Sequence, residues 1–269
     1  MNRKKLRLAL VGKDVSKSDS ERIHRFILKK WDLSCEYERF SVTAEEFDGV
    51  MRRLLGDFDG FNVTIPYKRD VMAYLDETAG DAFAFGAVNT VVTSSKTGYN
   101  TDGIGFMLML ERATVTVKGK KVLVLGAGGA GRSTAAALKQ AGAEVWVYQR
   151  RKEKLEEVCA ELGVYAAEKP TSGYNLLVNC TGVGMHETEG ISPVDESVFC
   201  GVETAVDLIY TPEKSEFLCL AERQGSRILN GAAMLFYQAY YADCLYVGKT
   251  PSGEEAETLY KEYLTKTKD

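Results

Sequence analysis

The chain has 269 residues, 45% of them hydrophobic, which fits a globular protein of one large or two smaller domains and excludes disordered and fibrous classes. Its formal net charge of −4 provides no positive field for a polyanion, so nucleic acid is not an expected partner. No stretch approaches the roughly 18 consecutive apolar residues of a membrane helix, so no membrane span is expected. The short apolar run near the start predicts a first strand and not a signal peptide.

The cysteines and histidines bear on compartment and metal binding. The two histidines, His24 and His186, lack the spacing of metal ligands, so no metal site is expected. The cysteines form no CxxC pair and mostly lie in apolar surroundings, which is typical of buried free thiols in a reducing cytoplasm. We therefore expect a cytoplasmic protein. The six cysteines are Cys35, Cys159, Cys180, Cys200, Cys219 and Cys244.

The first hundred residues alternate between strand and helix patterns, as βαβ units and parallel sheets do. Thr43 and Glu46 form a capping-box pattern ahead of an apolar stripe, which predicts the start of an amphipathic helix. Runs rich in β-branched and aromatic residues predict strands at 7–12, 35–42, 60–66 and 87–93, and helical periods predict helices at 21–31, 43–56 and 67–76.

A second series of the same kind follows a connecting helix predicted at 103–113. The residues beyond about 239 are too few for a domain, so they are expected to pack back on the first part of the chain. Strands of the second series are predicted at 120–125, 144–149, 175–181, 204–209 and 226–229, and a long helix at 231–248.

A glycine-rich turn joins the first strand of the second series to a helix. Gly126, Gly128 and Gly131 fit the pattern GxGxxG directly after the strand KVLVL. Glycine is needed there because the turn is tight, the backbone approaches a pyrophosphate and the helix packs close to the strand, so that N–H groups face the anion. The motif predicts dinucleotide binding; the alternative is a glycine-rich turn without a ligand.

The end of the next strand bears on which dinucleotide is bound. An NAD enzyme usually places a carboxylate there for the ribose 2′-hydroxyl, but this chain has Gln149, Arg150 and Arg151, followed by Lys152 and Lys154. Guanidinium groups favour a 2′-phosphate because their forked, charge-assisted hydrogen bonds match its oxygens. The cluster indicates NADP; the alternative is a solvated basic helix start.

Three clusters in the first part of the chain do not follow from packing. NVTIPYK (62–68) places polar side chains at alternate positions of a strand and ends on a lysine, GAVNT (86–90) has an asparagine in a strand-like run, and NTDG (100–103) puts an aspartate before a helix. Taken singly, each could be turn chemistry.

Together these motifs resemble those of the shikimate dehydrogenase family, over nearly the whole chain and in family order. The resemblance also rests on GAGGAG (126–131), NCTGVGM (179–185), DLIY (207–210) and NGAAMLFYQ (230–238). It implies an α/β fold of two domains and the reversible reduction of 3-dehydroshikimate to shikimate by NADPH, on the pathway to aromatic amino acids. The implied domains are a substrate domain with a mostly parallel sheet at 1–102, completed by C-terminal helices at 240–269, and a Rossmann NADP-binding domain at 103–239.

The resemblance also implies roles for individual residues. Lys68 and Asp102 correspond to the catalytic pair. The residues that correspond to substrate ligands are Ser18, Ser20, Asn62, Thr64, Asn89, Tyr210 and Gln238. Those that correspond to cofactor ligands are Gly126, Gly128, Gly129, Ala130, Gly131, Gln149, Arg150, Arg151, Thr181, Met185 and Gly231, where Gln149, Arg150 and Arg151 stand for an Asn-Arg-Thr cluster of the family.

The chemistry agrees with this pair independently. A hydride delivered to a carbonyl carbon leaves charge on the oxygen, so a cation that also donates a proton is needed, and the reverse reaction needs a base. Lysine can do both, because partial burial favours loss of its proton while a neighbouring carboxylate stabilises its charged form. Lys68 and Asp102 therefore fit a reversible ketone reduction.

One motif departs from the family pattern. Where the family has His-Ser-x-Ser-Pro for the substrate carboxylate, this chain has Lys17, Ser18, Asp19, Ser20 and Glu21. Glu21 adds a negative charge beside that site, which bears on substrate orientation and identity. The alternative is structural: Ser18 and Glu21 also fit a capping box, with Ser18 as N-cap of the following helix.

Two other functions remain open from the sequence. One is an NAD-dependent quinate or quinate/shikimate dehydrogenase, or a paralogue on a related hydroxy acid; the lack of a carboxylate near Arg150 disfavours NAD. The other is a non-catalytic dinucleotide sensor, which would need neither Lys68 nor Asp102. The expected partner is a small-molecule substrate, and the expected assembly is a monomer or a homodimer.

Overall fold

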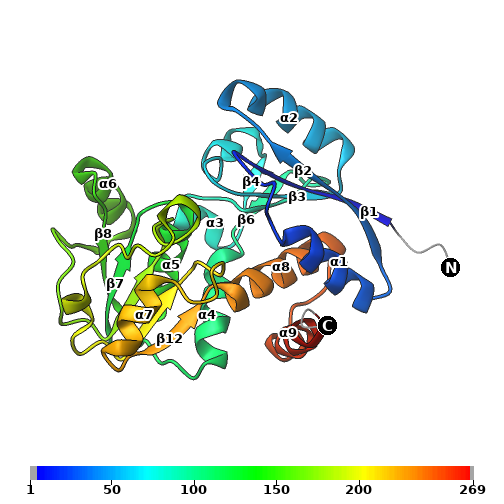
Figure 1. Ribbon diagram of the computed structural model, residues 1–269. Coiled ribbons are helices and arrows are strands. Elements are labelled where there is room, and N and C mark those ends of the chain that lie inside the picture. The colour runs from blue at the N-terminus through cyan, green and yellow to red at the C-terminus, as the bar shows by residue number, and fades with distance from the viewer. Residues whose placement is uncertain (1–4, 267–269) are drawn as a thin grey trace. The chain divides into compact units, whose positions relative to one another are not determined.

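The computed structural model describes residues 5–266, and the chain divides into two compact units (Figure 1). The first unit holds the residues up to Gly105 and those from Leu235 onward, and the second unit is Phe106–Met234. The chain leaves the first unit inside helix α4 (Asp102–Arg112) and returns inside helix α8 (Ala232–Val247). The boundaries expected from the sequence, 102/103 and 239/240, differ from these by a few residues. Both lie inside a continuous helix, whose local pattern contains no signal for the boundary.

The sheet of the first unit mixes parallel and antiparallel pairs. Its order is β2-β1-β3-β5-β6-β4, in which β1 is parallel to β2 and β3, β4 is parallel to β6, and β5 is antiparallel to β3 and β6. The sequence did not predict β4 or β6, which have only two and three residues. The strands are β1 (Lys5–Gly12), β2 (Ser34–Ser41), β3 (Gly60–Val63), β4 (Glu77–Thr78), β5 (Thr90–Val92) and β6 (Thr97–Tyr99).

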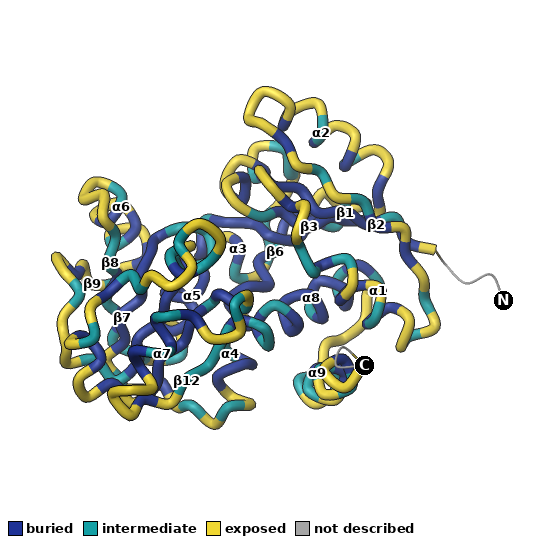
Figure 2. Tube along the Cα trace, viewed as in Figure 1, coloured by how far each residue is buried: buried dark blue, intermediate teal, exposed yellow. Residues whose placement is uncertain are grey.

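Strand β1 is buried on both faces, so its side chains alternate between two apolar cores. Leu8 and Leu10 pack in a cluster with residues of α1 and α8, whereas Ala9 and Val11 pack in a cluster with residues of α2. Figure 2 shows the same strand as an almost continuous buried segment. The helices of this unit, besides α8, are α1 (Ser20–Lys30), α2 (Ala44–Asp57), α3 (Asp81–Phe85) and α9 (Gly253–Lys266).

The C-terminal segment packs on the first unit. In α9 the Tyr263 ring lies 5.3 Å from the Phe26 ring of α1, and the Tyr240 hydroxyl of α8 donates a hydrogen bond of 2.8 Å to Glu255 of α9. Aromatic pairs of this kind stabilise the fold by more than the apolar area that they bury. Helix α9 is thus part of the first unit's core.

The helix predicted at 67–76 is wrong. Only a short 3₁₀ helix, Asp70–Tyr74, forms there. The Lys68 carbonyl accepts a hydrogen bond of 2.8 Å from the Val88 N–H, so it does not accept the helical bond from Met72, whose N–H bonds the Arg69 carbonyl at 3.1 Å instead. A long-range backbone contact, invisible in the local period, replaces the helix.

The second unit has a wholly parallel sheet of order β12-β11-β10-β7-β8-β9. This is the Rossmann strand order, in which the second and third strands lie on one side of the first strand and the fourth, fifth and sixth lie on its other side. The place between the first and fourth strands is the switch point of the order, and ligands bind there, beyond the carboxyl ends of the strands. Here the switch lies between β7 and β10. The strands are β7 (Lys121–Leu125), β8 (Glu144–Tyr148), β9 (Tyr165–Ala166), β10 (Leu176–Asn179), β11 (Thr204–Asp207) and β12 (Arg227–Asn230).

Helices of the second unit follow strands β7, β8 and β11. On one side, Leu123 and Leu125 of β7 share an apolar core with Phe217 and Leu218. The connection from β7 to its helix carries the glycine motif, and the connection from β8 to its helix carries the arginines. The helices are α5 (Gly129–Gln140), α6 (Lys152–Leu162) and α7 (Glu216–Arg223).

Candidate active site

Lys68 and Asp102 form a buried ion pair in the first unit. The Lys68 Nζ lies 2.5 Å from the Asp102 Oδ2, and the two residues are 8% and 6% exposed. Lys68 follows β3 on an irregular turn, whereas Asp102 is the first residue of α4. Burying a charged side chain without a counter-charge is costly, so the pairing offsets the cost of burying both groups.

Asn89 connects this pair to its surroundings. Its Nδ2 donates to the Asp102 Oδ1 at 2.8 Å and to the Thr101 Oγ1 at 3.0 Å, while its Oδ1 accepts from the Thr101 N–H at 2.8 Å. Asn89 and Thr101 are almost completely buried. The network fixes the Asp102 carboxylate, and Thr101 is a member that the sequence did not identify, because a threonine between Asn100 and Asp102 carries no signal of its own.

Two further predicted residues lie against Asn89. Asn62 donates from Nδ2 to the Asn89 carbonyl at 3.2 Å, and the Gln238 Oε1 lies 3.5 Å from the Asn89 Nδ2. The Asn62 Oδ1 is buried without a hydrogen-bond partner in the described part of the chain, so it can accept from a substrate hydroxyl. Thr64 lies just beyond β3 and is half-buried. The first unit thus brings Lys68, Asp102, Asn89, Asn62 and Gln238 together.

The serine pair has its own geometry at the start of α1. The Ser18 Oγ lies 3.1 Å from the Ser20 Oγ and accepts from the Ser20 N–H at 3.2 Å. The N-cap residue is Asp19 and no side chain caps it, so the capping box of Ser18 and Glu21 is wrong. A helix starting at Ser20 places Glu21 in its first turn, where it is not the N3 residue.

Glu21 turns toward arginines. Its Oε1 accepts from the Arg25 Nε at 3.0 Å, and its Oε2 lies 3.7 Å from the Arg39 Nε. The negative charge that the sequence placed beside the serine pair is thereby offset by two cations. An anion at the start of α1 meets less repulsion than the sequence alone suggested.

The glycine motif lies at the switch point of the second sheet. The Gly126 N–H donates to the Tyr148 carbonyl at 2.8 Å, which sets the loop beside the end of β8. A Cβ on Gly131 would lie 2.0 Å from the Gly126 carbonyl oxygen, whereas a Cβ on Gly128 would meet nothing within 4 Å. Packing explains Gly131 but not Gly128. The open space over Gly128, at the N-terminus of α5, suits the close approach of a pyrophosphate.

This difference predicts opposite effects of two alanine substitutions. Gly128→Ala is expected to weaken NADP binding about tenfold or more with little change in melting temperature, because the added methyl occupies ligand space. Gly131→Ala, its matched control, is expected to destabilise the fold by about 1 to 3 kcal/mol through overpacking. Titration of NADP and thermal unfolding measure the two effects. If Gly128→Ala binds NADP as tightly as the wild type, no pyrophosphate approaches this loop.

Arg150 and Arg151 are exposed at the end of β8 and form no ion pair among residues 5–266. Arg151 is the N-cap residue of α6, where a positive charge is unfavourable because it faces the positive end of the helix dipole. Gln149 beside them is half-buried and accepts the Arg150 N–H at 3.0 Å. Two cations at an unfavourable helix start fit an anionic ligand better than a structural role.

Hydrogen bonds from the side chains of Asn179 and Asp207 fix the loop after β10. The Asn179 Oδ1 accepts from the Thr181 Oγ1 at 2.6 Å, and its Nδ2 donates to the Asp207 Oδ1 at 3.0 Å. Asp207 also accepts from the Ser215 Oγ at 2.5 Å and the Ile209 N–H at 3.0 Å. The sequence motifs contained Asn179 and Asp207 but gave them no role; both are fully buried.

Asp207 predicts a pH dependence of stability. Burial raises its pKa to about 6, although hydrogen bonds from Ser215, Ile209 and Asn179 lower it. Because this lies above the ordinary 3.8, the folded state binds more protons between about pH 4 and pH 6, and the stability from this group falls as pH rises through that window.

Asp207→Asn is expected to remove this slope. The free energy of unfolding of the wild type relative to the variant should fall by up to about 3 kcal/mol from pH 4 to pH 7. Urea unfolding of both proteins across that range measures the difference. Parallel profiles would contradict a raised pKa at Asp207.

The remaining predicted residues lie in the second unit. Tyr210 and Met185 are half-buried and follow the two loops that Asp207 and Asn179 hold. A Cβ on Gly231 would lie 2.0 Å from the Leu208 carbonyl oxygen. Packing alone thus explains glycine at 231, whatever its part in cofactor binding.

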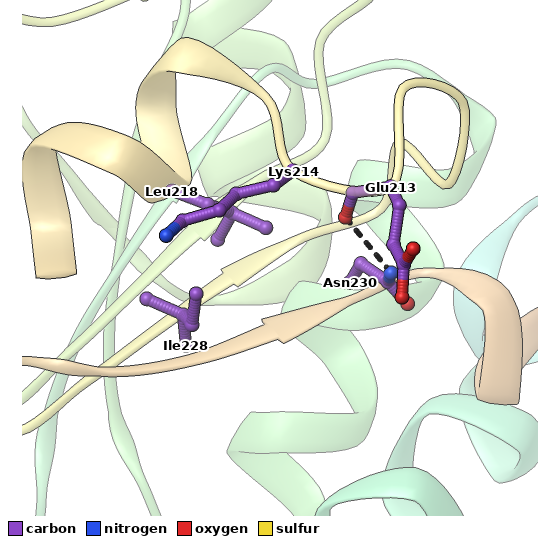
Figure 3. A pocket seen from close by; sticks show the side chains of 5 residues that line it. All are labelled: Glu213, Lys214, Leu218, Ile228 and Asn230. Carbon is purple, nitrogen blue, oxygen red and sulfur yellow. Dashed lines mark hydrogen bonds between the residues drawn. The ribbon is translucent and has the colours of Figure 1, made fainter.

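The second unit also has a pocket of about 330 Å³ that is lined by residues outside the predicted site (Figure 3). It is lined by Glu213, Lys214, Leu218, Ile228 and Asn230, none of which belongs to the predicted site. The Asn230 Nδ2 donates to the Glu213 carbonyl at 2.9 Å across its rim. Within residues 5–266, no cluster of His, Cys, Asp or Glu suits a metal ion, and no helix is long and apolar enough to cross a membrane.

Family models and sequence relatives both identify similarity to shikimate dehydrogenases. The family described as "Shikimate dehydrogenase substrate binding domain" matches residues 10–91, and that described as "Alanine dehydrogenase/PNT, C-terminal domain" matches residues 97–181. A shikimate dehydrogenase (NADP(+)) of Thermus thermophilus is 38% identical over 256 residues, covering 93% of this chain and 96% of the relative. That of Carboxydothermus hydrogenoformans is 38% identical over 258 residues, covering 90% and 91%.

A solved structure indicates the same family as the sequence relatives do. The crystal structure of shikimate 5-dehydrogenase from Thermus thermophilus, in complex with NADP(H) and shikimate, superimposes with a TM-score of 0.87. Its sequence is 36% identical, and the superposition covers 96% of this chain and 99% of that one. The similarity therefore extends over both units and is not confined to a common nucleotide fold.

Proposed function

Because the chain belongs to the shikimate dehydrogenase family, we propose that it catalyses the reversible, NADP-dependent reduction of 3-dehydroshikimate to shikimate. The observation that carries the proposal is the buried pair of Lys68 and Asp102, in which Asn89 donates a hydrogen bond to the Asp102 carboxylate. A protein that only sensed a dinucleotide would gain nothing from a buried charged pair in the other unit, since such pairs add little to stability.

In the proposed reaction Lys68 acts on the ketone oxygen. NADPH supplies the hydride when bound. As negative charge develops on the oxygen, the Lys68 ammonium stabilises it and donates a proton, and in the oxidation of shikimate the neutral amine takes the hydroxyl proton. Asp102 orients the Lys68 side chain and offsets its charge. The same two side chains therefore serve both directions, as microscopic reversibility requires.

Polar side chains around this pair would orient the ring. We assign Asn62, Thr64, Asn89 and Gln238 to the ring hydroxyls, because amide and hydroxyl groups can donate to or accept from an alcohol. Ser18 and Ser20 would hold the carboxylate at the start of α1, where backbone N–H groups and the helix dipole favour an anion. We also assign Tyr210 to the substrate.

The second unit is suited to NADP. The loop at Gly126, Gly128, Gly129, Ala130 and Gly131 would hold the pyrophosphate, and Gln149, Arg150 and Arg151 the 2′-phosphate. Thr181, Met185 and Gly231 would border the nicotinamide. The fit rests on the open space over Gly128 and on two arginines without ion-pair partners in the described chain.

This reaction places the enzyme in aromatic amino acid biosynthesis. We further propose that it works in the cytoplasm, in keeping with the free state of all six cysteines. Its assembly remains a prediction, either a monomer or a homodimer.

The test is an absorbance assay of reduced cofactor, with shikimate and quinate each supplied with NADP or NAD. Turnover with shikimate and NADP at a higher kcat/KM than with the other three pairs is expected. Preference for quinate or for NAD would redirect the proposal to the quinate enzymes. Absence of turnover with all four pairs would favour a sensor.

A further inference from the structure

Polar contacts shape the loop after β10, which runs over residues 180–188. The loop starts at the switch point of the second sheet and carries Thr181 and Met185, which we assign to the nicotinamide. Asn179 holds its first half: the Asn179 Oδ1 accepts from the Thr181 N–H at 3.0 Å, and the Asn179 Nδ2 donates to the Val183 carbonyl at 3.2 Å. The second half, which contains Met185, has a different anchor.

That anchor is the hydroxyl of Thr188, which contacts three backbone groups of the loop. The Thr188 Oγ1 accepts from the Gly184 N–H at 3.0 Å, and it lies 2.9 Å from the Met185 carbonyl oxygen and 3.1 Å from the Gly182 carbonyl oxygen. The hydroxyl has one proton, so it can donate to one of these two carbonyls at a time. Gly184 is buried, so its N–H would be costly to leave without this acceptor.

The Met185 side chain folds back over the same backbone. A Cβ on Gly182 would lie 3.8 Å from the Met185 Cε, so the end of the methionine side chain lies close to Gly182. Met185 is half-buried, which leaves part of its surface open to a ligand. Methionine is unbranched and has flexible side-chain bonds, so it presents a defined surface only where its surroundings are fixed. Thr188 contacts the backbone at both Gly182 and Met185.

The turn that brings Thr188 back onto the loop is strained. His186 has a φ of 51°, in the left-handed region that residues other than glycine rarely adopt. His186 and Glu187 are exposed, so burial of their side chains does not offset the cost. Backbone strain of this kind persists where the surrounding contacts fix it, and it is concentrated at ligand sites. The turn therefore points to a role of the Thr188 contacts in function.

We propose that Thr188 is a positioning residue for the nicotinamide: its hydroxyl fixes the backbone at Gly182, Gly184 and Met185 and so keeps the Met185 side chain against the nicotinamide ring. This role rests on the proposed function, which assigns Met185 to that ring. Thr188 itself contacts only the loop. Its effect on the cofactor is therefore confined to the nicotinamide half, whereas Arg150 and Arg151 hold the adenosine half.

Thr188→Val tests the role, because it keeps the branched shape of the side chain and removes the hydroxyl. The Kd for NADP is expected to rise about threefold to tenfold, in keeping with the loss of one or two hydrogen bonds. The Kd for adenosine 2′,5′-bisphosphate, which has the 2′-phosphate but no nicotinamide, should stay within about twofold. Thr188→Ser keeps the hydroxyl and should bind NADP as the wild type does. Calorimetric titration measures each Kd.

Ser192→Ala is the matched control. Ser192 is a half-buried hydroxyl a few residues further along, whose Oγ donates to the Val194 carbonyl at 2.7 Å and accepts from the Val194 N–H at 3.3 Å. Both bonds stay within its own turn, so the substitution should leave both Kd values unchanged. A folded Thr188→Val variant with the wild-type Kd for NADP overturns the proposal. Equal weakening of both ligands, or weak NADP binding by Thr188→Ser, also overturns it.

A double variant tests whether Thr188 acts through Met185. Met185→Ala should weaken NADP binding by itself, and adding Thr188→Val should weaken it little further, because the side chain that Thr188 positions is already gone. Fully additive effects would contradict the role. Melting temperatures identify a variant that has lost its fold, and Thr188→Ala then replaces Thr188→Val in the same titrations.

Binding and turnover together distinguish this proposal from the proposed function. Wild-type protein that oxidises shikimate, with a Thr188→Val variant that binds NADP equally well, refutes only the role of Thr188. Wild-type protein that binds NADP but does not oxidise shikimate refutes the proposed reaction, while the two titrations still decide the role of Thr188. Wild-type protein that binds neither NADP nor adenosine 2′,5′-bisphosphate refutes the cofactor assignment and the role of Thr188 with it.

Discussion

Lys68→Ala is expected to lower kcat for shikimate oxidation by at least about 100-fold, the usual contribution of a positioned general acid or base. The substitution removes a group that acts on the oxygen in the transition state, so kcat and kcat/KM should fall together. The Kd for NADP should stay within about twofold, because the substitution removes a group that acts on the reacting oxygen and leaves every predicted cofactor residue in place. Steady-state kinetics and a fluorescence titration with NADPH measure these quantities.

Two controls make the result interpretable. Lys29→Ala removes an exposed lysine of the same unit from helix α1 and should leave kcat unchanged. Lys68→Ala also leaves the Asp102 carboxylate buried without its cation, so its melting temperature should fall and kcat must be measured where the variant is folded. A folded Lys68→Ala variant with kcat near that of the wild type would refute the mechanism.

The fold could be predicted well where burial and local period agree. The alternation of strands and helices predicted both βαβ series, and the capping box at Thr43 and Glu46 is present at the start of α2. The prediction failed where long-range contacts decide. The helix predicted at 67–76 is absent because the Lys68 carbonyl bonds to Val88, and no local pattern contains that pairing.

The site could be predicted where a motif carries chemistry, and not where residues act only through neighbours. Lys68, Asp102 and Asn89 belong to motifs that resemble a family, and the structure brings them together. Thr101 lies within a motif but carries no signal of its own, and only the fold reveals that it is buried and bonded to Asn89.

The arginine pair at the start of α6 gives the sharpest test of the cofactor. The double substitution Arg150→Ala, Arg151→Ala is expected to lower the preference for NADP over NAD, measured as the ratio of the two kcat/KM values, by at least about tenfold. Hydrogen bonds to charged groups contribute about 1.5 to 3 kcal/mol each, so the loss of even one corresponds to this factor. Most of the loss should be in KM for NADP, with NAD almost unaffected.

Lys152→Ala is the matched control, because Lys152 is equally exposed at the same helix start but lies 3.8 Å from Glu156. If specific forked contacts with a phosphate select the cofactor, Lys152→Ala should leave the NADP to NAD ratio nearly unchanged. If a general positive field were responsible, the single lysine and the two arginines would contribute in proportion to their charge, and added salt would reduce the preference in every variant. An unchanged ratio in the double variant would mean that the arginines are only a solvated helix start. In that case α6 should also become more stable on their removal, because both substitutions take positive charge away from the positive end of its dipole.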